Sequence, residues 1–237
     1  MITEYQHGNR LITYPSHPLN DGMIKEVLNG ETYPLDKLRG YQPTIIVDIG
    51  SNVGASLIYF HEHFPQAKIH GFEPSKVNLE FNRKNTVGIP EIEIHPFGLM
   101  DQDAELPLFQ GLQTGAQHSL YSGVTTSHQT ETVQVRDARQ VLEGLGLTLI
   151  CLMKIDTEGS EVAILSRIFS EGSPIAVAHL FVEYHSSEEK IAIDTFLDPI
   201  YQKEEISAFE IPCYFPDGRL GSPIQAGVTF YRLRALG

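Results

Sequence analysis

Residues 44–54 read TIIVDIGSNVG, an apolar run that ends in Asp48 and continues into a turn containing Gly50 and Gly54. The unbroken apolarity of 44–49 is typical of a strand that is buried on both faces of a parallel sheet. The glycines lack a Cβ, so the chain can turn sharply and a ligand can approach the backbone. The stretch therefore predicts a central strand, a ligand-binding turn and the start of a helix.

Beyond this turn, strand-like and helix-like patterns of apolar residues alternate along the chain. Strands are expected at 67–72, 92–99, 149–155 and 176–183, with helices near 53–64, 75–86, 141–145, 162–169 and 186–198. Such alternation indicates βαβ units, in which a mostly parallel sheet carries helices on both faces. Apolar and polar residues alternate at 104–109 and 131–136, which predicts a hairpin-like excursion. Two late strand-like runs, at 206–213 and 227–232, predict a closing antiparallel hairpin.

The first 43 residues lack this pattern and contain prolines at positions 15, 18, 34 and 43. A short helix at 23–28, ended by Asn29-Gly30, is the element expected there. We therefore predict an irregular N-terminal cap segment at 1–43 and one α/β domain at 44–237. A chain of this length is sufficient for a single domain with a full hydrophobic core.

The composition narrows the classes of partner. The chain contains 30 acidic and 17 basic residues, a formal net charge of -13 at pH 7. Binding to a nucleic-acid backbone requires clustered lysine and arginine, so a nucleic-acid substrate is disfavoured. No apolar run approaches the ~18 residues of a membrane span, and the first eight residues do not resemble a signal peptide. A soluble cytoplasmic protein is expected, and its oligomeric state is open.

The turn at 48–54 has the chemistry of a site for a zwitterionic ligand. Backbone amides that open the helix near Val53 carry partial positive charge and suit a carboxylate. Asp48 is expected to direct its negative charge into the same crevice and attract a cation. S-adenosylmethionine (SAM) has both groups at its methionine end, whereas Asp48 would repel a pyrophosphate. The dinucleotide motif Gly-x-Gly-x-x-Gly is also absent from this stretch.

A carboxylate that binds the ribose is expected at the end of the second strand. Glu73 follows Gly50 by 23 residues, close to the spacing of about 20 for a ribose-binding carboxylate. Asp101, just past the third expected strand, is a candidate for the adenine amino group, with a solvated loop carboxylate as an equal alternative. The residues expected to bind the cofactor are Asp48, Gly50, Ser51, Asn52, Gly54, Glu73, Pro74 and Asp101.

Four motifs resemble those of one enzyme family. VDIGSNVG at 47–54, FEP at 72–74 and KIDTEGSE at 154–161 are similar to the FkbM family of SAM-dependent methyltransferases, and VEYH at 182–185 also fits. The most distinctive of these is the stretch 154–161. The family more often has Thr-Leu-Asp where this chain has Arg-Asp-Ala at 136–138, a difference that lies outside the cofactor turn. The resemblance covers roughly residues 24–185.

This resemblance implies the fold and the reaction. The expected fold is the Rossmann-like α/β fold of class I methyltransferases, with a mostly parallel seven-stranded sheet, helices on both faces and a closing antiparallel hairpin. The expected cofactor is SAM. The expected reaction is O-methylation of a hydroxyl on a sugar, glycan, lipid or polyketide-type acceptor, and the acceptor itself is not identified.

Candidate catalytic residues lie at the ends of two later strands. Asp156 ends the fourth strand, and Lys154 lies two residues earlier on the same face, where it can pair with a carboxylate. Glu183 and His185 end the fifth strand and likewise share a face. A hydroxyl acceptor must lose its proton during attack, and the ordinary pKa of histidine, about 6.5, makes His185 a candidate base. Glu158 and Glu161 follow Asp156, and Glu161 is expected on a solvated first helical turn.

Several alternatives stay open at this stage. Asp156 and Glu183 are possible oxygen ligands for Mg²⁺, but the sequence contains no complete ligand set, so no metal is expected. His118 is a candidate for the acceptor pocket, with a plain loop histidine as the stronger alternative. A Rossmann-type oxidoreductase that uses NAD(P) and a non-catalytic nucleotide-binding module of the same fold are the competing functions.

Overall fold

The structure, a computed structural model, describes residues 1–109, 120, 130–211 and 224–236. Its largest sheet is formed by β3 (Ile45–Ile49), β4 (Lys68–Phe72), β5 (Ile92–His95), β9 (Leu149–Ile155), β10 (Ala176–Tyr184), β11 (Tyr201–Ile211) and β12 (Ile224–Leu233). These seven strands follow the order β11-β12-β10-β9-β3-β4-β5. Neighbouring strands are parallel except that β12 is antiparallel to both β10 and β11. The predicted fold class is confirmed.

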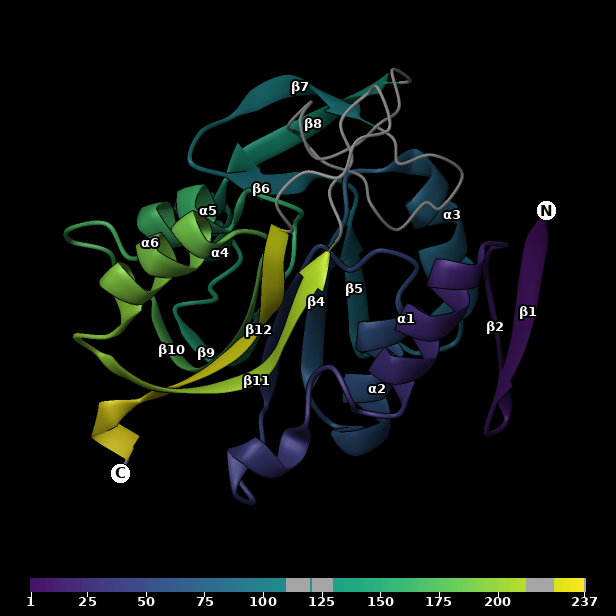
Figure 1. The fold of residues 1–237 in the computed structure, drawn as a ribbon, viewed down its shortest axis with the longest axis horizontal. Coiled ribbons are helices and arrows are strands. Elements are labelled where there is room, and N and C mark those ends of the chain that lie inside the picture. The colour runs from purple at the N-terminus through teal and green to yellow at the C-terminus, as the bar shows by residue number, and fades with distance from the viewer. Residues whose placement is uncertain (110–119, 121–129, 212–223, 237) are drawn as a thin grey trace.

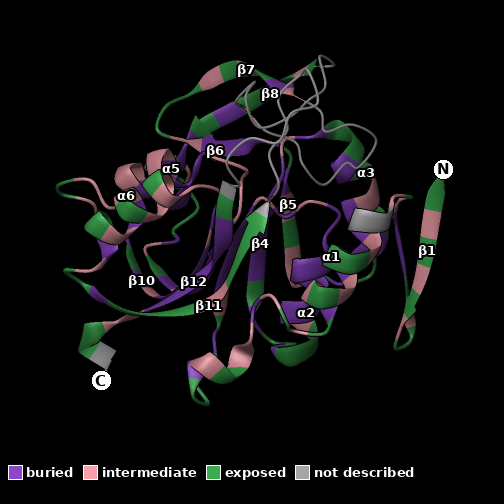
Figure 2. Ribbon diagram, viewed as in Figure 1, coloured by how far each residue is buried: buried purple, intermediate pink, exposed green. Residues whose placement is uncertain are grey.

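Two groups of helices cover the two faces of this sheet (Figure 1). The first group contains α1 (Pro18–Leu28), α2 (Ala55–His63) and α3 (Lys76–Asn85). The second contains α4 (Ala138–Gly144), α5 (Glu161–Ile168) and α6 (Ser187–Leu197). Burial follows this arrangement, because the central strands are buried along most of their length while the outer sides of the helices are exposed (Figure 2).

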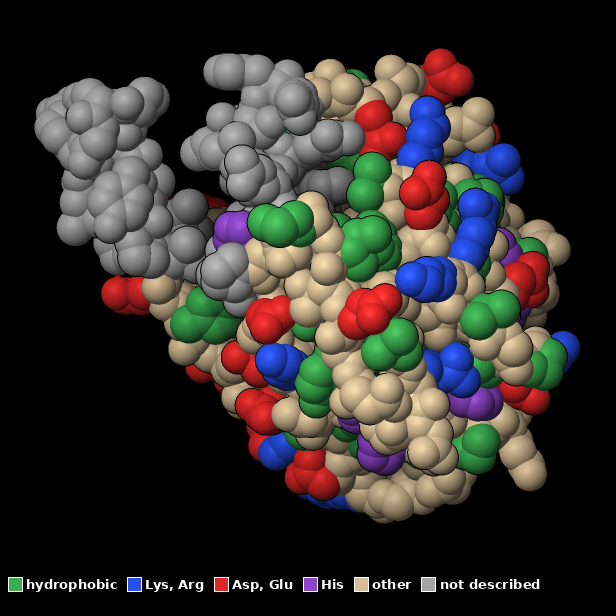
Figure 3. Space-filling model, turned by 90° about the vertical axis from the view of Figure 1, so that its right-hand side faces the viewer, with side chains coloured by type: hydrophobic (Ala, Val, Ile, Leu, Met, Phe, Trp, Pro, Cys, Tyr) green, Lys and Arg blue, Asp and Glu red, His purple; other side chains and the backbone are tan. Residues whose placement is uncertain are grey.

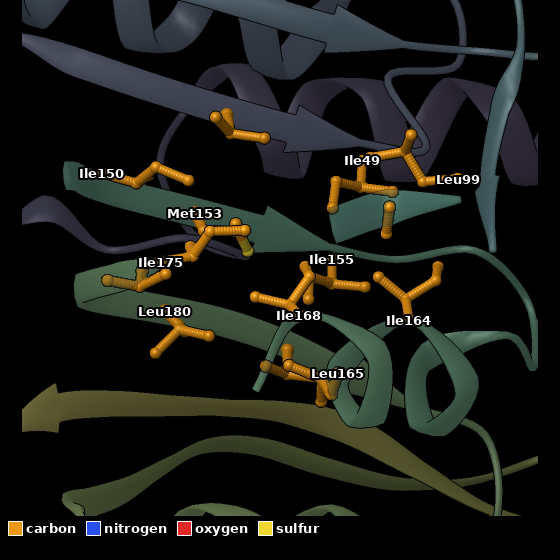
Figure 4. Packing of buried hydrophobic residues seen from close by; sticks show 14 of the residues in the cluster. Ile49, Leu99, Ile150, Met153, Ile155, Ile164, Leu165, Ile168, Ile175 and Leu180 are labelled. Atoms are coloured by element: carbon orange, nitrogen blue, oxygen red, sulfur yellow. The ribbon is translucent and has the colours of Figure 1, made fainter. Parts of the chain in front are cut away.

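Helix α5 shows how the sequence pattern becomes packing. Its apolar residues recur three and four positions apart, so they form one stripe that faces the sheet. This stripe packs against the apolar faces of β9 and β10 (Figure 4). The buried side chains in this contact are Ile164, Leu165 and Ile168 on α5, Met153 and Ile155 on β9, and Leu180 on β10.

The third expected strand is divided into two. The expected range 92–99 contains β5, which ends at His95, and a separate short strand, β6 (Gly98–Met100). Pro96 lies between them, and proline cannot donate a ladder hydrogen bond in a continuing strand. β6 instead joins β8 (Thr130–Asp137) in a second sheet of order β6-β8-β7, where β7 (Ala104–Phe109) is antiparallel to β8. The expected hairpin-like excursion is thus confirmed.

The N-terminal segment is more regular than expected. β1 (Ile2–His7) and β2 (Arg10–Pro15) form an antiparallel hairpin, and α1 begins at Pro18 rather than near residue 23. The prediction of an irregular segment was wrong because it gave the prolines too much weight. Pro18 stands at the first helical position, which proline tolerates well, and Gly8-Asn9 is a two-residue hairpin signal. The domain boundary at residue 43 stays a prediction.

The closing hairpin of β11 and β12 is confirmed, but β11 starts at Tyr201, five residues before the expected start. Residues 202–205 are Gln-Lys-Glu-Glu, and charged residues are common on an edge strand because they oppose edge-to-edge association. Because these residues are polar, a prediction based on the pattern of apolar residues missed the start of the strand. The expected turn at 216–218 lies outside the described residues.

Acidic and basic side chains are interspersed on the face that carries the N-terminal hairpin, α1 and α3 (Figure 3).

Within the described residues, none of the helices is both long enough and apolar enough to span a membrane.

Candidate cofactor and catalytic site

Two adjoining cavities lie at the carboxyl ends of β3, β4, β9 and β10, where open α/β sheets bind ligands. The larger measures about 730 Å³ and the smaller about 530 Å³, and both are open to solvent. They meet at the turn after β3 and share Met23, Gly50, Asn52 and Asp156 as lining residues. Residues far apart in the sequence therefore form one continuous cleft.

The turn after β3 requires glycine at position 50. Gly50 has a φ of +80°, and a Cβ at this position would lie 1.8 Å from the backbone oxygen of Asp156. The amides of Gly50 and Ser51 both donate to the carbonyl oxygen of Phe72, each at 3.0 Å. The carbonyl of Gly50 accepts a hydrogen bond of 2.6 Å from Lys154 Nζ. The turn is thus held against both neighbouring strands.

Two asparagines on α3 support the same turn from the other side. Asn82 Nδ2 donates to Ser51 Oγ and to the carbonyl of Asn52, both at 3.0 Å. Asn85 Nδ2 donates to the carbonyl of Val53 at 2.9 Å. Gly54, with a φ of +87°, lines neither cavity, and a Cβ there would lie 3.0 Å from Asn82 Oδ1. Sequence reasoning missed both asparagines, although residues three apart share a helix face.

Glu73 lies where the sequence predicted it, at the end of β4 and in the wall of the larger cavity beside Pro74. Its two carboxylate oxygens accept from the amides of Asn52 at 2.9 Å and Ser75 at 2.8 Å. Burial raises the pKa of Glu73 to about 7, although these two hydrogen bonds oppose the shift. Each carboxylate oxygen has a second lone pair, so capacity for a ligand hydroxyl remains.

Asp48 does not face the cleft as expected. It is fully buried, lines neither cavity, and accepts a hydrogen bond of 2.5 Å from Ser56 Oγ. Lys154 Nζ lies 3.2 Å from its other carboxylate oxygen. In the parallel register Asp48 is directly opposite Lys154, so its charge is compensated inside the sheet. The expectation that Asp48 meets a ligand cation is therefore corrected.

Asp156 stands at the junction of the two cavities. Its side chain is 26% exposed, and its Oδ2 lies 3.4 Å from Lys154 Nζ and accepts from the hydroxyl of Tyr33 at 3.2 Å. Burial disfavours the charge of Lys154, but Asp48 and Asp156 outweigh that effect and raise the pKa of Lys154 above its ordinary value. Lys154 therefore remains a cation that fixes Asp156 and the carbonyl of Gly50 together. Tyr33 was not identified from the sequence.

Asp101 is placed differently from the other expected cofactor residues. It is exposed, follows β6 and lines neither cavity. The break at Pro96 is the reason, because β5, the strand in the main sheet, ends at His95, six residues before Asp101. Gly98 and Leu99 line the larger cavity instead, together with Leu108 and Leu120.

A cluster of charged residues, which we call the acidic cluster, adjoins the larger cavity and comprises Asp156, Glu158, Glu183 and His185. Asp156, Glu158 and Glu183 line that cavity. Nε2 of His185 is 3.3 Å from Glu158 Oε2 and 3.7 Å from Glu183 Oε1. Burial raises the pKa of Glu158 to about 7 and that of Glu183 well above its ordinary value. The structure thus brings together the four groups.

His185 differs from its expected role as a base of ordinary pKa. Burial disfavours its charged form, but Glu189, Glu158 and Glu161 outweigh that effect and raise the pKa of His185 well above its usual value. His185 also lines neither cavity. A protonated imidazole has no free lone pair, so this setting argues against His185 as the proton acceptor. His118 lies outside the described residues.

Glu161 is not on a solvated helical turn, as the sequence suggested. It is fully buried, and its Oε1 accepts from the amide of Thr157 at 2.5 Å and from its hydroxyl at 2.8 Å. Its Oε2 accepts from the amide of Gly159 at 2.9 Å. Glu161 therefore holds the loop that carries Glu158.

Part of the chain is similar to known proteins. Residues 48–209 match the model of the methyltransferase FkbM domain. Methyltransferase 1 of Beauveria bassiana (strain ARSEF 2860) is 28% identical over 149 residues, which are 54% of this chain and 59% of that protein. Methyltransferase sdnD of Sordaria araneosa is 26% identical over 200 residues, 71% of this chain and 76% of that protein. The chain thus matches less than two thirds of the Beauveria protein.

Among solved structures, the N-terminal domain of EvdMO1 with SAH bound has a similar fold. Its TM-score is 0.51 at 11% sequence identity, with 88% of this chain and 81% of that chain covered.

Proposed function

Because the chain belongs to the methyltransferase FkbM domain family, we propose that it transfers a methyl group from SAM to a hydroxyl oxygen of a sugar, glycan, lipid or polyketide-type acceptor. The observation that carries the proposal is the junction at Gly50, where the two cavities meet beside Asp156. A carboxylate at this junction can reach both a cofactor in the cleft and a second molecule beside it.

The residues that line the cleft suit the chemistry of SAM. The larger cavity offers Glu73 for ribose hydroxyls, with Leu99 and Pro74 as apolar surface for a base. The smaller cavity is lined by residues 50–53 and by Lys154, which suits the carboxylate of an amino acid. Gly50 lines both cavities and lets the turn lie close against the backbone of Asp156. When bound, SAM supplies an electrophilic methyl group on a sulfonium.

The chain's own contribution to transfer would be orientation and proton removal. Asp156 is the proposed acceptor of the hydroxyl proton, because it is partly exposed at the junction and its position is fixed by Lys154 and Tyr33. Glu183 lines the same cavity and is the second candidate. Holding the reacting oxygen in line with the transferred group can supply much of the rate.

Calorimetric titration of the purified chain tests this proposal. We expect micromolar binding of SAM and of S-adenosylhomocysteine and no binding of NADH, followed by methyl transfer in a screen of glycans and hydroxylated lipids. Binding of NADH alone would favour an oxidoreductase. Binding of the sulfur compounds without transfer to any acceptor would favour a non-catalytic module of the same fold.

The affinity for SAM is expected to fall as the pH decreases from 8 to 6. Glu73, with a pKa raised to about 7, gains a proton across this range and loses acceptor capacity for ribose hydroxyls. The fall should not exceed about tenfold per pH unit below the pKa. Calorimetry at pH 6, 7 and 8 measures it.

Glu73→Gln should bind SAM more weakly than the wild type and with a flatter pH profile. Glu80→Gln, at an exposed position on α3, should keep the wild-type profile. An equally steep profile in the Glu73→Gln variant would remove Glu73 as the titrating group.

A further inference from the structure

The acidic cluster has the arrangement of a metal site. One ligand atom from each of Asp156, Glu158 and His185 lies within 4.8 Å of the other two. Glu183 Oε1 is the next oxygen, 3.7 Å from His185 Nε2. These residues come from the ends of β9 and β10 and from the loop before α5, so the fold, not a single sequence motif, brings them together.

The two ring nitrogens of His185 face different groups. Nε2 faces Glu158 and Glu183, whereas Nδ1 faces Glu161 at 3.9 Å and Glu189 at 3.7 Å. Both nitrogens are shielded from solvent, and neither has a hydrogen-bond partner among the residues that the structure describes. Histidines that bind metals commonly have a carboxylate beside the nitrogen that does not bind the ion. Nε2 is therefore positioned as a ligand, and binding of the ion would displace the proton that this nitrogen carries in the metal-free protein.

The loop that carries Glu158 has an unfavourable backbone conformation. Glu158 has a φ of +58°, which a residue with a Cβ adopts at an energetic cost. Such conformations persist where surrounding contacts enforce them and are frequent at functional sites. Here Glu161 enforces the conformation through three hydrogen bonds to residues 157 and 159. The result is that Glu158 lines the cavity beside His185.

The excess of acidic over basic side chains around the cluster also favours binding of a cation. Lys154 and His185 together lie within 3.9 Å of six carboxylates, those of Asp48, Asp156, Glu158, Glu161, Glu183 and Glu189. Buried charges are costly unless they are compensated. Acidic side chains thus outnumber basic ones here, and a divalent cation would offset the negative charge that the carboxyls gain when they release their protons to bind it.

We propose that Asp156, Glu158 and His185 bind a divalent cation of the Mg²⁺ or Mn²⁺ class at the wall of the larger cavity, with Glu183 as a further oxygen ligand. Three oxygens and one imidazole favour such a cation over a thiolate-preferring one. Adjacent ligands of an octahedral ion lie about 3 Å apart, and His185 Nε2 and Glu158 Oε2 are 3.3 Å apart. This inference extends the proposed function, because the cation would orient an acceptor oxygen beside Asp156.

Manganese binding to the full chain tests the site without SAM or acceptor. After removal of metals with a chelator, Mn²⁺ is titrated and the loss of the free-ion electron paramagnetic resonance signal is recorded. We expect binding at the acidic cluster, with His185→Gln and Glu158→Gln each weakening it at least tenfold. Near-UV circular dichroism of each variant establishes that it is folded, and the two substitutions provide independent tests.

A second histidine cluster provides the matched control. His70 and His95, on β4 and β5, have ring nitrogens 3.1 Å apart, with Glu93 oxygens 3.7 and 3.9 Å away. His70→Gln should leave Mn²⁺ binding at the acidic cluster unchanged. Binding that is lost in His70→Gln but kept in His185→Gln would overturn the proposal, as would no binding to the wild type at millimolar Mn²⁺.

The outcomes separate this inference from the proposed function. Binding of SAM and methyl transfer in excess chelator, with no Mn²⁺ binding, would leave the function and remove the metal site. Mn²⁺ binding that requires His185, without any SAM binding, would retain the metal site and remove the function.

Discussion

Gly50→Ala is expected to weaken SAM binding by about 100-fold. The added Cβ would lie 1.8 Å from the backbone oxygen of Asp156, which cannot move without shifting the end of β9. Forcing an extra carbon into a packed site costs roughly 1–3 kcal/mol, and a φ of +80° adds strain for alanine. Since 1.4 kcal/mol corresponds to about tenfold in affinity, the combined distortion accounts for the expected loss.

Gly88→Ala separates the clash from the strain. Gly88 has the same φ of +80°, and a Cβ there would have no heavy atom within 4 Å. We expect this variant to lose some stability but to bind SAM as the wild type does. Calorimetry with SAM, together with thermal unfolding of both variants, makes the comparison. Equal SAM affinities in the two variants would show that the contact between residue 50 and Asp156 does not shape the site.

The glycine turn was predictable because its signal is local. Strand 44–49, the turn after it and Glu73 at the end of the next strand all follow from spacing along the chain. The reason why position 50 requires glycine was only partly predictable. The sequence suggested that glycine lets the chain turn sharply and a ligand approach the backbone, whereas in the structure an added Cβ would lie against the backbone of Asp156. That neighbour is distant in sequence, and only the parallel pairing of β3 with β9 brings it close.

Partners from distant segments explain most of what the sequence missed. Tyr33 donates to Asp156 across 123 residues of sequence, and no local pattern connects the two. Asp48 was misplaced for the same reason, since its compensation by Lys154 depends on strand register. The pKa of a side chain also depends on the neighbours that the fold brings to it. The ordinary pKa of histidine describes an isolated side chain, but carboxylates from three segments surround His185.

Asp156→Asn is expected to bind SAM within a few-fold of the wild type but to lose most methyl transfer. Asparagine preserves the shape of the side chain and can still accept from Tyr33, while Lys154 keeps its contacts with Asp48 and the carbonyl of Gly50. What is lost is a carboxylate that can take a proton, a contribution worth about 10²- to 10⁴-fold in rate. Single-turnover transfer of a labelled methyl group measures the transfer rate, and calorimetry measures the affinity for SAM.

Tyr33→Phe distinguishes proton transfer from positioning. It removes the hydrogen bond to Asp156 but keeps the carboxylate, so its transfer rate should fall far less than that of Asp156→Asn. Single-turnover transfer of a labelled methyl group by the wild type and both variants makes the comparison. Full transfer activity in Asp156→Asn would exclude Asp156 as the base and make Glu183, in the same cavity wall, the residue to replace next.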